Sequence, residues 1–385
     1  MKIVYCLPQI YNPGGIERIT TIKANYFAEV MKWEVVIITA QQNGKPVFYT
    51  LASSVSVIDL NIDYEKMNSL NLIRRFMYKK KLQRIHKRKL TELLFSLKAD
   101  IVVSTLGNDS EFLPIISDGS KKILEFHFCR KHKRIMADTF HYSLFTKLAF
   151  YFRCWQEEHI IIPKFDQFVV LTQEDKNRWK ELIPSVINIP NILPYEKEGK
   201  AQLNNKIVIA VGRYDAQKRF DRIIDIWNKI AKKHPDWILN IFGQGPDKDK
   251  LQKQIDILNL HNKIILRGTS RNMKEHYMSS SIFVMTSAYE GLPMTLLEAT
   301  GLGLPSVCFN FPCGPMDVIV NGVNGFIVED DDISMFANQL DLLMSDDIKR
   351  IKMGENAYVM SEKFSHDKIM KSWVDLFRLQ TQQID

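Results

Sequence analysis

The stretch IFVMTSAYEGLPMTLLEAT, residues 282–300, passes from an apolar strand through a loop into a helix. Its first four residues are all apolar, which is typical of a parallel strand covered on both faces. Pro293 suits the first turn of the helix, where its missing amide hydrogen would have had no partner. The stretch is therefore one strand–loop–helix unit of an α/β fold.

The same unit recurs on both sides of this stretch. The hydrophobic pattern predicts short apolar strands that alternate with amphipathic helices, the arrangement of doubly wound parallel sheets. Thr172 is placed to cap the helix that begins near Gln173. The predicted strands are 2–10, 33–40, 55–60, 101–106, 122–127, 167–172, 206–212, 237–243, 263–268, 282–287, 305–310 and 325–329, and the predicted helices include 16–30, 70–97, 219–233, 247–259, 272–280, 293–301 and 366–379.

Residues 189–205 interrupt the alternation of strands and helices. This segment contains prolines, a glycine and polar residues, and it is interpreted as a linker. A chain of 385 residues also exceeds what one hydrophobic core usually supports. The prediction is an α/β fold of two Rossmann-like, doubly wound domains, 1–190 and 191–365, facing each other across a cleft. Such a cleft places ligands at the carboxyl ends of the strands.

The composition is that of an ordinary globular protein, with 45% hydrophobic and 25% charged residues. The apolar N-terminal run ends at Leu7, too short for a signal peptide, and no run is long enough to span a membrane. A cytoplasmic protein is expected. The five cysteines lack paired metal-ligand spacing and are interpreted as free, reduced and structural.

Positive charge is concentrated in the first half, where residues 1–200 hold 30 Lys/Arg and 21 Asp/Glu. Nine Lys/Arg and no acid fall between Arg74 and Lys89, and a second cluster spans Arg130 to Arg134. An aromatic-rich helix is predicted within 140–155. This combination favours an anionic membrane surface, with a solvated helix face as the alternative. Nucleic acid is not expected, because no recognition motif accompanies the charge.

The loop and helix of the opening stretch carry groups that suit a sugar nucleotide. The amides of Met294, Thr295 and Leu296 are expected to be free at the helix N-terminus, which favours an anion such as diphosphate. Glu290 and Glu298 on either side can accept hydrogen bonds from sugar hydroxyls. The alternative is a plain turn between two solvated glutamates.

Three further groups of residues that could bind a sugar nucleotide lie at other strand ends. Arg213 and Lys218 flank the turn after a strand, where two cations can neutralise a diphosphate. Gly14 and Gly15 allow close approach of the backbone to a ligand, although the third glycine of a dinucleotide fingerprint is missing. His127 ends a strand and is expected to face the cleft; a structural histidine is the alternative.

Taken together, these segments resemble the retaining GT-B glycosyltransferases of the large family 4. The resemblance extends in order along nearly the whole chain. It rests on GGIER (14–18), EFHF (125–128), VLTQED (170–175), IPNIL (189–193), VGRYDAQKRFD (211–221), FGQGP (242–246), SAYEGLPMTLLEA (287–299) and DVIVNGVNGFIVE (317–329).

The resemblance implies a role for each of these residues. Glu298 would bind the ribose, and Arg213 and Lys218 the diphosphate; His127 would lie beside the reacting centre. Glu290 would contact the donor sugar. Residues 1–190 would form the acceptor-binding domain and residues 191–365 the donor-binding domain, and the last helix, 366–385, would cross back onto the first domain. The remaining donor-binding residues would be Gly14, Gly15, Gly268, Thr269, Gly291, Leu292, Pro293, Met294, Thr295 and Leu296.

The resemblance also implies the reaction and the partners. A hexose or N-acetylhexosamine would pass from a nucleotide sugar, UDP-linked, to a glycan or polyprenyl-diphosphate-linked saccharide, with retention and without a metal or other cofactor. The setting would be capsule, O-antigen or exopolysaccharide synthesis at the inner face of the cytoplasmic membrane. The acidic segments 247–249 and 329–332 are interpreted as solvated turns. The alternatives are a sugar-nucleotide epimerase or hydrolase on this fold, and a non-catalytic nucleotide-binding module.

Overall fold

A computed structural model describes residues 1–69, 72–130, 132–139, 142–195 and 198–382. Within them the first part of the chain forms a seven-stranded parallel sheet in the order β3-β2-β1-β4-β5-β6-β7. Its strands are β1 (Lys2–Leu7), β2 (Glu34–Thr39), β3 (Val55–Asp59), β4 (Ile101–Ser104), β5 (Lys121–Phe126), β6 (Gln167–Val170) and β7 (Ile187–Asn188).

The second part forms a six-stranded parallel sheet in the order β10-β9-β8-β11-β12-β13. In both sheets the strand order reverses beside the first strand, which creates a crevice at the carboxyl ends of the neighbouring strands. The strands are β8 (Ile207–Val211), β9 (Ile238–Phe242), β10 (Ile264–Gly268), β11 (Ile282–Met285), β12 (Ser306–Phe309) and β13 (Gly325–Val328).

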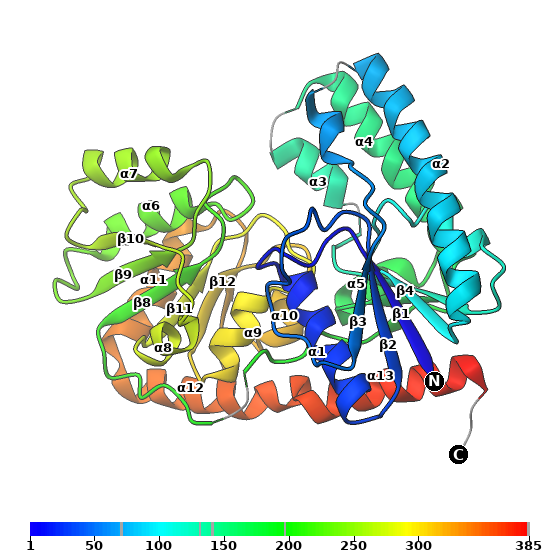
Figure 1. Ribbon diagram of the computed structural model, residues 1–385. Helices are drawn as coiled ribbons and strands as arrows, with labels where there is room; N and C mark the ends of the chain where they lie inside the picture. The colour runs from blue at the N-terminus through cyan, green and yellow to red at the C-terminus, as the bar shows by residue number, and fades with distance from the viewer. Residues whose placement is uncertain (70–71, 131, 140–141, 196–197, 383–385) are drawn as a thin grey trace.

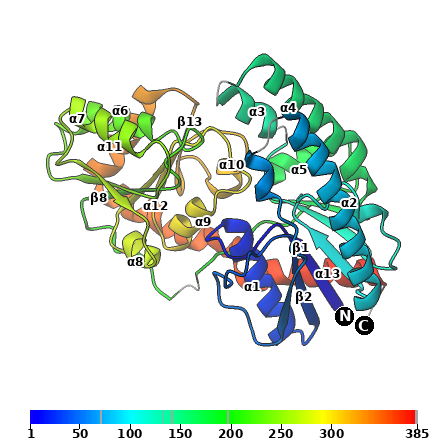
Figure 2. The same ribbon diagram turned by 45° about the horizontal axis from the view of Figure 1, so that its top comes forward.

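Helices cover both sheets, and Figures 1 and 2 show the two units lying side by side. Around the first sheet are α1 (Gly15–Glu29), η1 (Glu65–Ser69), α2 (Leu72–Leu97), η2 (Leu113–Ile115), α3 (His132–Thr139), α4 (Leu144–Gln156), the π-helical η3 (Glu157–Ile161), η4 (Ile162–Lys164) and α5 (Gln173–Trp179). The rest are α6 (Phe220–Ile230), α7 (Lys248–Ile257), α8 (Met273–Met278), α9 (Met294–Gly301), α10 (Pro315–Val318), α11 (Ile333–Ser345), α12 (Asp347–Met360), η5 (Ser361–Phe364) and α13 (His366–Thr381).

The last helix, α13, returns from the second unit to the first sheet along the lower edge of Figure 1. Trp373 and Phe377 are buried in the cluster that covers one face of that sheet. The ring of Phe377 lies 5.2 Å from that of Phe27 on α1. The first unit therefore draws part of its core from the far end of the chain.

The predicted α/β fold with two parallel sheets is confirmed, and Thr172 caps α5 by accepting from the amide of Asp175 (3.0 Å). The first strand is shorter than predicted and ends at Leu7, because the loop that begins with Pro8 leaves the sheet. The sequence did not predict β7, α3, α11 or α12. Residues 70–71 of the predicted helix 70–97 lie outside the described residues.

Candidate functional site

Two of the predicted site residues form an ion pair. Lys218 follows the turn after β8, Glu290 lies in the loop between β11 and α9, and Nζ of Lys218 is 2.6 Å from Oε1 of Glu290. The lysine side chain lies across Gly212, where an added Cβ would meet its Cε at 2.9 Å. Because glycine has no side chain, it leaves the space through which the lysine side chain reaches the carboxylate.

Arg213 lies on the same turn and extends into solvent. Its side chain is 77% exposed, and Nε is 3.5 Å from Oδ2 of Asp215. The structure therefore places this second cation at the same strand end without joining it to the Lys218–Glu290 pair. An exposed guanidinium at such a position can bind an anion.

Glu298 is buried inside α9, where both of its carboxylate oxygens have protein partners. Oε1 accepts from Nη1 of Arg18 (2.7 Å), and Oε2 accepts from the hydroxyl of Tyr277 (2.8 Å). Burial raises the pKa of Glu298, while the charge of Arg18 opposes this rise. The ion pair joins α1 of the first unit to α9 of the second, so the two units meet at this carboxylate.

Arg18 is held in place by more than its carboxylate partner. Its guanidinium lies 4.9 Å from the ring centre of Tyr195 and 5.9 Å from that of Tyr49, and Nη2 donates to the carbonyl of Pro194 (3.3 Å). Burial alone would lower the pKa of Arg18, but Glu298 and the tyrosines raise it. Arg18 stays charged in a largely enclosed position.

The helix starts of the two units approach each other beside this ion pair. Gly14 caps α1, and a Cβ added to Gly15 would lie 3.4 Å from Cγ of Met294 at the start of α9. Two helix N-termini therefore face the same space, which favours negative charge there. Glu17 of the first turn is buried, and burial raises the pKa of its carboxyl.

His127 follows β5 directly and contacts the second unit. A Cβ on Gly291 would collide with the carbonyl oxygen of His127, so only glycine allows this approach. The imidazole is just 5% exposed, with Nε2 at 3.4 Å from Oε1 of Glu125. The predicted cleft-facing histidine is thus largely enclosed between a buried glutamate and the Glu290 loop.

A buried ion pair stands behind His127. Nζ of Lys23 pairs with Oε2 of Glu125, and neither side chain is exposed by more than 1%. Burial would raise the pKa of Glu125, but Lys23 and then His127 lower it to about 2. Glu125 therefore presents a fixed negative charge to the imidazole.

The remaining residues of the predicted phosphate-binding segment pack as follows. Leu292, Pro293 and Leu296 are buried, and the loop is anchored by the amide of Glu290, which donates to Pro312 (2.8 Å). The expectation of a free amide at Leu296 is wrong. Pro293 caps the helix rather than lying in its first turn, and its carbonyl accepts from Leu296 at 3.0 Å.

Gly268 and Thr269, predicted for the base pocket, lie at the carboxyl end of β10, the edge strand of the second sheet. The carbonyl of Gly268 accepts from the amide of Gly243 (2.8 Å). The following helix, α8, carries Tyr277 to Glu298. The structure thus links this strand end to the predicted ribose site through α8.

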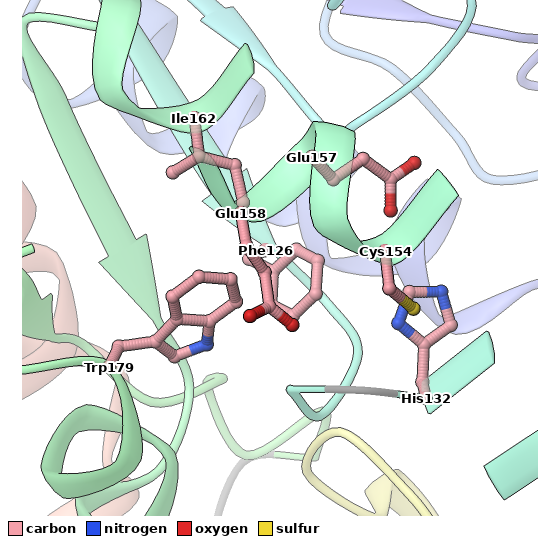
Figure 3. A pocket seen from close by; sticks show the side chains of 7 residues that line it. All are labelled: Phe126, His132, Cys154, Glu157, Glu158, Ile162 and Trp179. Carbon is pink, nitrogen blue, oxygen red and sulfur yellow. The ribbon is translucent and has the colours of Figure 1, made fainter. Parts of the chain in front are cut away.

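A small cavity behind α4 is unsuitable for a substrate (Figure 3). Its volume is 10 Å³, about the minimum for one water molecule. Burial, with Lys133 nearby, lowers the pKa of His132 in its wall to about 3. The lining residues are Phe126, His132, Cys154, Glu157, Glu158, Ile162 and Trp179.

In the described ranges, no group of three or more His, Cys, Asp or Glu side chains is placed to hold a metal ion. The prediction of metal-independent chemistry stays a prediction.

Sequence reasoning missed Arg18, Tyr277 and the Lys23–Glu125 pair. The lysine did leave a signal, because Ile19, Lys23 and Phe27 follow one another at helical spacing on a buried face. Arg18 left none, since its partner lies 280 positions away in the sequence.

The chain is similar to known proteins over much of its length. Residues 194–360, which include Lys218, Glu290 and Glu298, match the family "Glycosyl transferases group 1". A Haemophilus influenzae relative called an uncharacterized glycosyltransferase is 29% identical over 97% of this chain and 98% of its own length. The amylovoran biosynthesis glycosyltransferase AmsD of Erwinia amylovora is 33% identical over 55% of this chain, and the match spans 62% of AmsD.

The fold has close structural neighbours. The crystal structure of TarM superposes with a TM-score of 0.80 at 15% identity, over 98% of this chain and 99% of TarM. That likeness concerns the fold alone, two parallel-sheet units as in GT-B enzymes. Residues 194–360 are therefore similar to the group 1 glycosyltransferases, a relative that is named a glycosyltransferase matches along nearly the whole chain, and the fold is that of GT-B enzymes.

Proposed function

We propose that the chain transfers a hexose or N-acetylhexosamine from a UDP-sugar to a lipid-linked glycan, with retention, during synthesis of a cell-surface polysaccharide. One observation carries this proposal. Two carboxylates on one strand–loop–helix segment are each paired with a cation: Glu290 with Lys218 in the turn after β8, and Glu298 with Arg18 on α1 of the first unit. Carboxylates suit sugar hydroxyls, and the cations and helix starts between them suit a diphosphate.

The proposed roles follow from these positions. Glu298 binds ribose hydroxyls, while Lys218 and Arg213 bind the diphosphate and stabilise it as it leaves, in place of a metal ion. Glu290 orients the donor sugar and holds Lys218 in place. His127, with Glu125 fixed behind it, lies beside the reacting sugar.

The names of similar proteins support the donor and the setting. S. aureus TarM has been crystallised with UDP and an α-GlcNAc-glycerol. AmsD is named for amylovoran biosynthesis.

The test is UDP release from a panel of UDP-sugars, with and without a polyprenyl-diphosphate-linked saccharide. We expect the acceptor to stimulate UDP release. NMR of the product should show that the α configuration of the donor sugar is kept. Release that ignores every acceptor would instead indicate a hydrolase or epimerase. Binding of UDP without any turnover would refute the transfer reaction.

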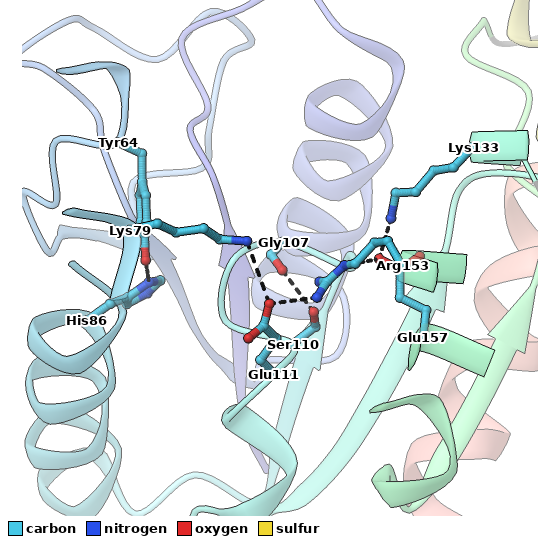
Figure 4. A network of polar contacts seen from close by, with 9 residues as sticks. All are labelled: Tyr64, Lys79, His86, Gly107, Ser110, Glu111, Lys133, Arg153 and Glu157. Carbon is cyan, nitrogen blue, oxygen red and sulfur yellow. Dashed lines mark hydrogen bonds and ion pairs between the residues drawn. The ribbon is translucent and has the colours of Figure 1, made fainter. Parts of the chain in front are cut away.

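We also propose that α2 and α4 rest on an anionic membrane. The two helices lie side by side in Figures 1 and 2, joined by Glu111, which pairs with Lys79 (3.8 Å) and Arg153 (2.7 Å; Figure 4). On α4, Phe145 is 86% exposed and Leu144 70%. Exposed apolar residues beside a basic helix suit an anionic lipid surface.

The second basic cluster, Arg130 to Arg134, is partly neutralised by acidic partners. Arg130 pairs with Glu158 (3.1 Å) and Lys133 with Glu157, while Lys131 lies outside the described residues. Among the described residues, no helix is long and apolar enough to cross a membrane.

Vesicle co-sedimentation tests the membrane proposal. Replacing four exposed cations of α2 by serine should abolish binding to vesicles with 30% anionic lipid, while four exposed lysines of the second unit serve as the control set. Equal binding by the two variants would refute it. The α2 set is Lys80, Lys81, Arg84 and Arg88, and the control set is Lys229, Lys232, Lys248 and Lys253.

A further inference from the structure

A second cavity, of 220 Å³, opens at the carboxyl ends of the first sheet. Sites for drug-sized molecules have volumes of roughly 300–1,000 Å³, so this cavity is smaller than they are. A volume of this size suits one or two sugar rings. Its walls come from the loops after β1, β2 and β4 and from the segment that enters η1. The lining residues are Pro8, Gln9, Tyr11, Ala40, Gln41, Tyr64, Glu65 and Asn108.

The far wall of this cavity is rigid. Gln41 is buried, and its Oε1 accepts from the amides of Tyr64 (2.8 Å) and Glu65 (3.3 Å). The hydroxyl of Tyr64 pairs with Nδ1 of His86 on α2 at 3.0 Å (Figure 4). These contacts fix both the backbone and the ring before anything binds, which limits the entropy that a ligand must overcome.

The chemistry of the lining is polar and free of positive charge. Gln9 and Asn108 offer amide groups, Tyr11 offers a hydroxyl and a ring, and Glu65 offers a carboxylate 3.3 Å from that hydroxyl. None of the lining residues is a lysine or arginine, although this half of the chain carries the basic excess. Lys45 lies nearby but is placed over the ring of Tyr11, at 4.2 Å.

The cavity adjoins the helix start of the first unit. Nε2 of Gln9, in its wall, donates to Oε1 of Glu17 (3.2 Å) in the first turn of α1. Glu17 follows Gly14 and Gly15, where the helix starts of the two units approach each other. A sugar held in the cavity would therefore lie next to the space that we assign to the donor diphosphate.

We infer that this cavity binds the terminal sugar of the acceptor, and that this sugar is neutral. Amide, hydroxyl and carboxylate groups pair with sugar hydroxyls, and tyrosine rings pack against the apolar faces of a sugar ring. The carboxylate of Glu65, unopposed by a lining cation, disfavours a phosphate or a uronic acid. The inference rests on the proposed glycosyl transfer and names the substrate class of its second site.

The test compares neutral and charged acceptors of the same sugar. Methyl glycosides of glucose, galactose and N-acetylglucosamine would be assayed beside their 6-phosphates, with UDP release as the readout. We expect kcat/KM to favour the neutral form at least tenfold. Glu65→Lys should reverse or abolish this preference while leaving UDP binding unchanged. Glu92→Lys, the same charge change on the exposed face of α2, is the control.

If Glu65→Lys shifts the preference no more than Glu92→Lys does, or if the wild type prefers the phosphates, the inference is overturned. If the wild type releases no UDP from any donor, the proposed transfer fails instead. The cavity is then tested directly by saturation-transfer NMR with the same glycosides, whose signals should weaken in Asn108→Ala and Glu65→Lys but not in Glu92→Lys.

Discussion

Arg18 and Glu298 lie on helices that cover different sheets, yet their charged groups are 2.7 Å apart. Of the two side chains, Glu298 is the more enclosed, and its second oxygen is taken by Tyr277. A buried carboxylate keeps its charge only when a cation or hydrogen-bond donors accompany it. The first unit thus supplies the counter-ion for the carboxylate that we assign to the ribose.

Removing this counter-ion should weaken donor use most strongly at low pH. Burial raises the pKa of Glu298 and Arg18 lowers it, so in Arg18→Ala the carboxylate takes up a proton at higher pH than in the wild type. We expect kcat/KM for the donor to fall about 10- to 100-fold, the range for a hydrogen bond to a charged group, with partial rescue by Arg18→Lys. The measurement is kcat/KM against pH, and superimposable normalised profiles would contradict the idea.

Lys218→Ala should lower kcat far more than it raises the KM for the donor. The ammonium group is placed to stabilise charge that develops on the leaving diphosphate, and losing one such contact typically costs about 10²–10³ in kcat. Steady-state kinetics with the best donor measures the effect, and thermal unfolding checks that the fold is intact. A rate equal to the wild type would remove Lys218 from the reaction.

Glu298→Ala should act differently, through the KM for the donor. A ribose contact is made equally in the ground state and the transition state, so its loss weakens binding rather than turnover. Calorimetric titration with UDP should show lower affinity in the variant. Unchanged UDP affinity would refute the ribose assignment while leaving Lys218 untouched.

Gly291→Ala should destabilise the contact between the two units. The added methyl group meets the carbonyl oxygen of His127, and overpacking of this kind costs about 1–3 kcal/mol. Gly15→Ala is the matched control at the same junction, because its methyl group would make an ordinary 3.4 Å contact with Met294. Thermal unfolding should show a lower Tm for the first variant only. Equal Tm values would show that the junction adapts freely.

Asp109→Asn should stabilise the protein at neutral pH. Burial raises the pKa of Asp109 from 3.8 to about 6, and its Oδ2 has no partner. The unfolded chain therefore loses this proton first, and folded stability falls as the pH rises from about 4 to 6. A shift of this size corresponds to about 3 kcal/mol. The variant should unfold at higher temperature than the wild type at pH 7.5 and at nearly the same temperature at pH 4.

Sequence patterns predicted elements better than they predicted partners. Apolar runs such as 282–287 specify strands because burial on both faces of a parallel sheet demands them, so both sheets were foreseen. The two-residue strand β7 is too short to show the run or alternation of apolar residues from which a strand is predicted. The pairing of Lys218 with Glu290 could be suspected from two motifs at neighbouring strand ends. Arg18 could not be paired, because nothing local in GGIER specifies a partner on another sheet.

The return of α13 to the first sheet bears on the order in which the chain matures during synthesis. The second unit's hydrophobic cluster is complete once Phe364 has been made, whereas one face of the first sheet still lacks Trp373 and Phe377. At about 5–20 residues per second, the interval between β7 and Phe377 lasts roughly 10 to 40 s. Over that time strands made early keep an apolar face uncovered. The half translated first is therefore the half whose core is completed last.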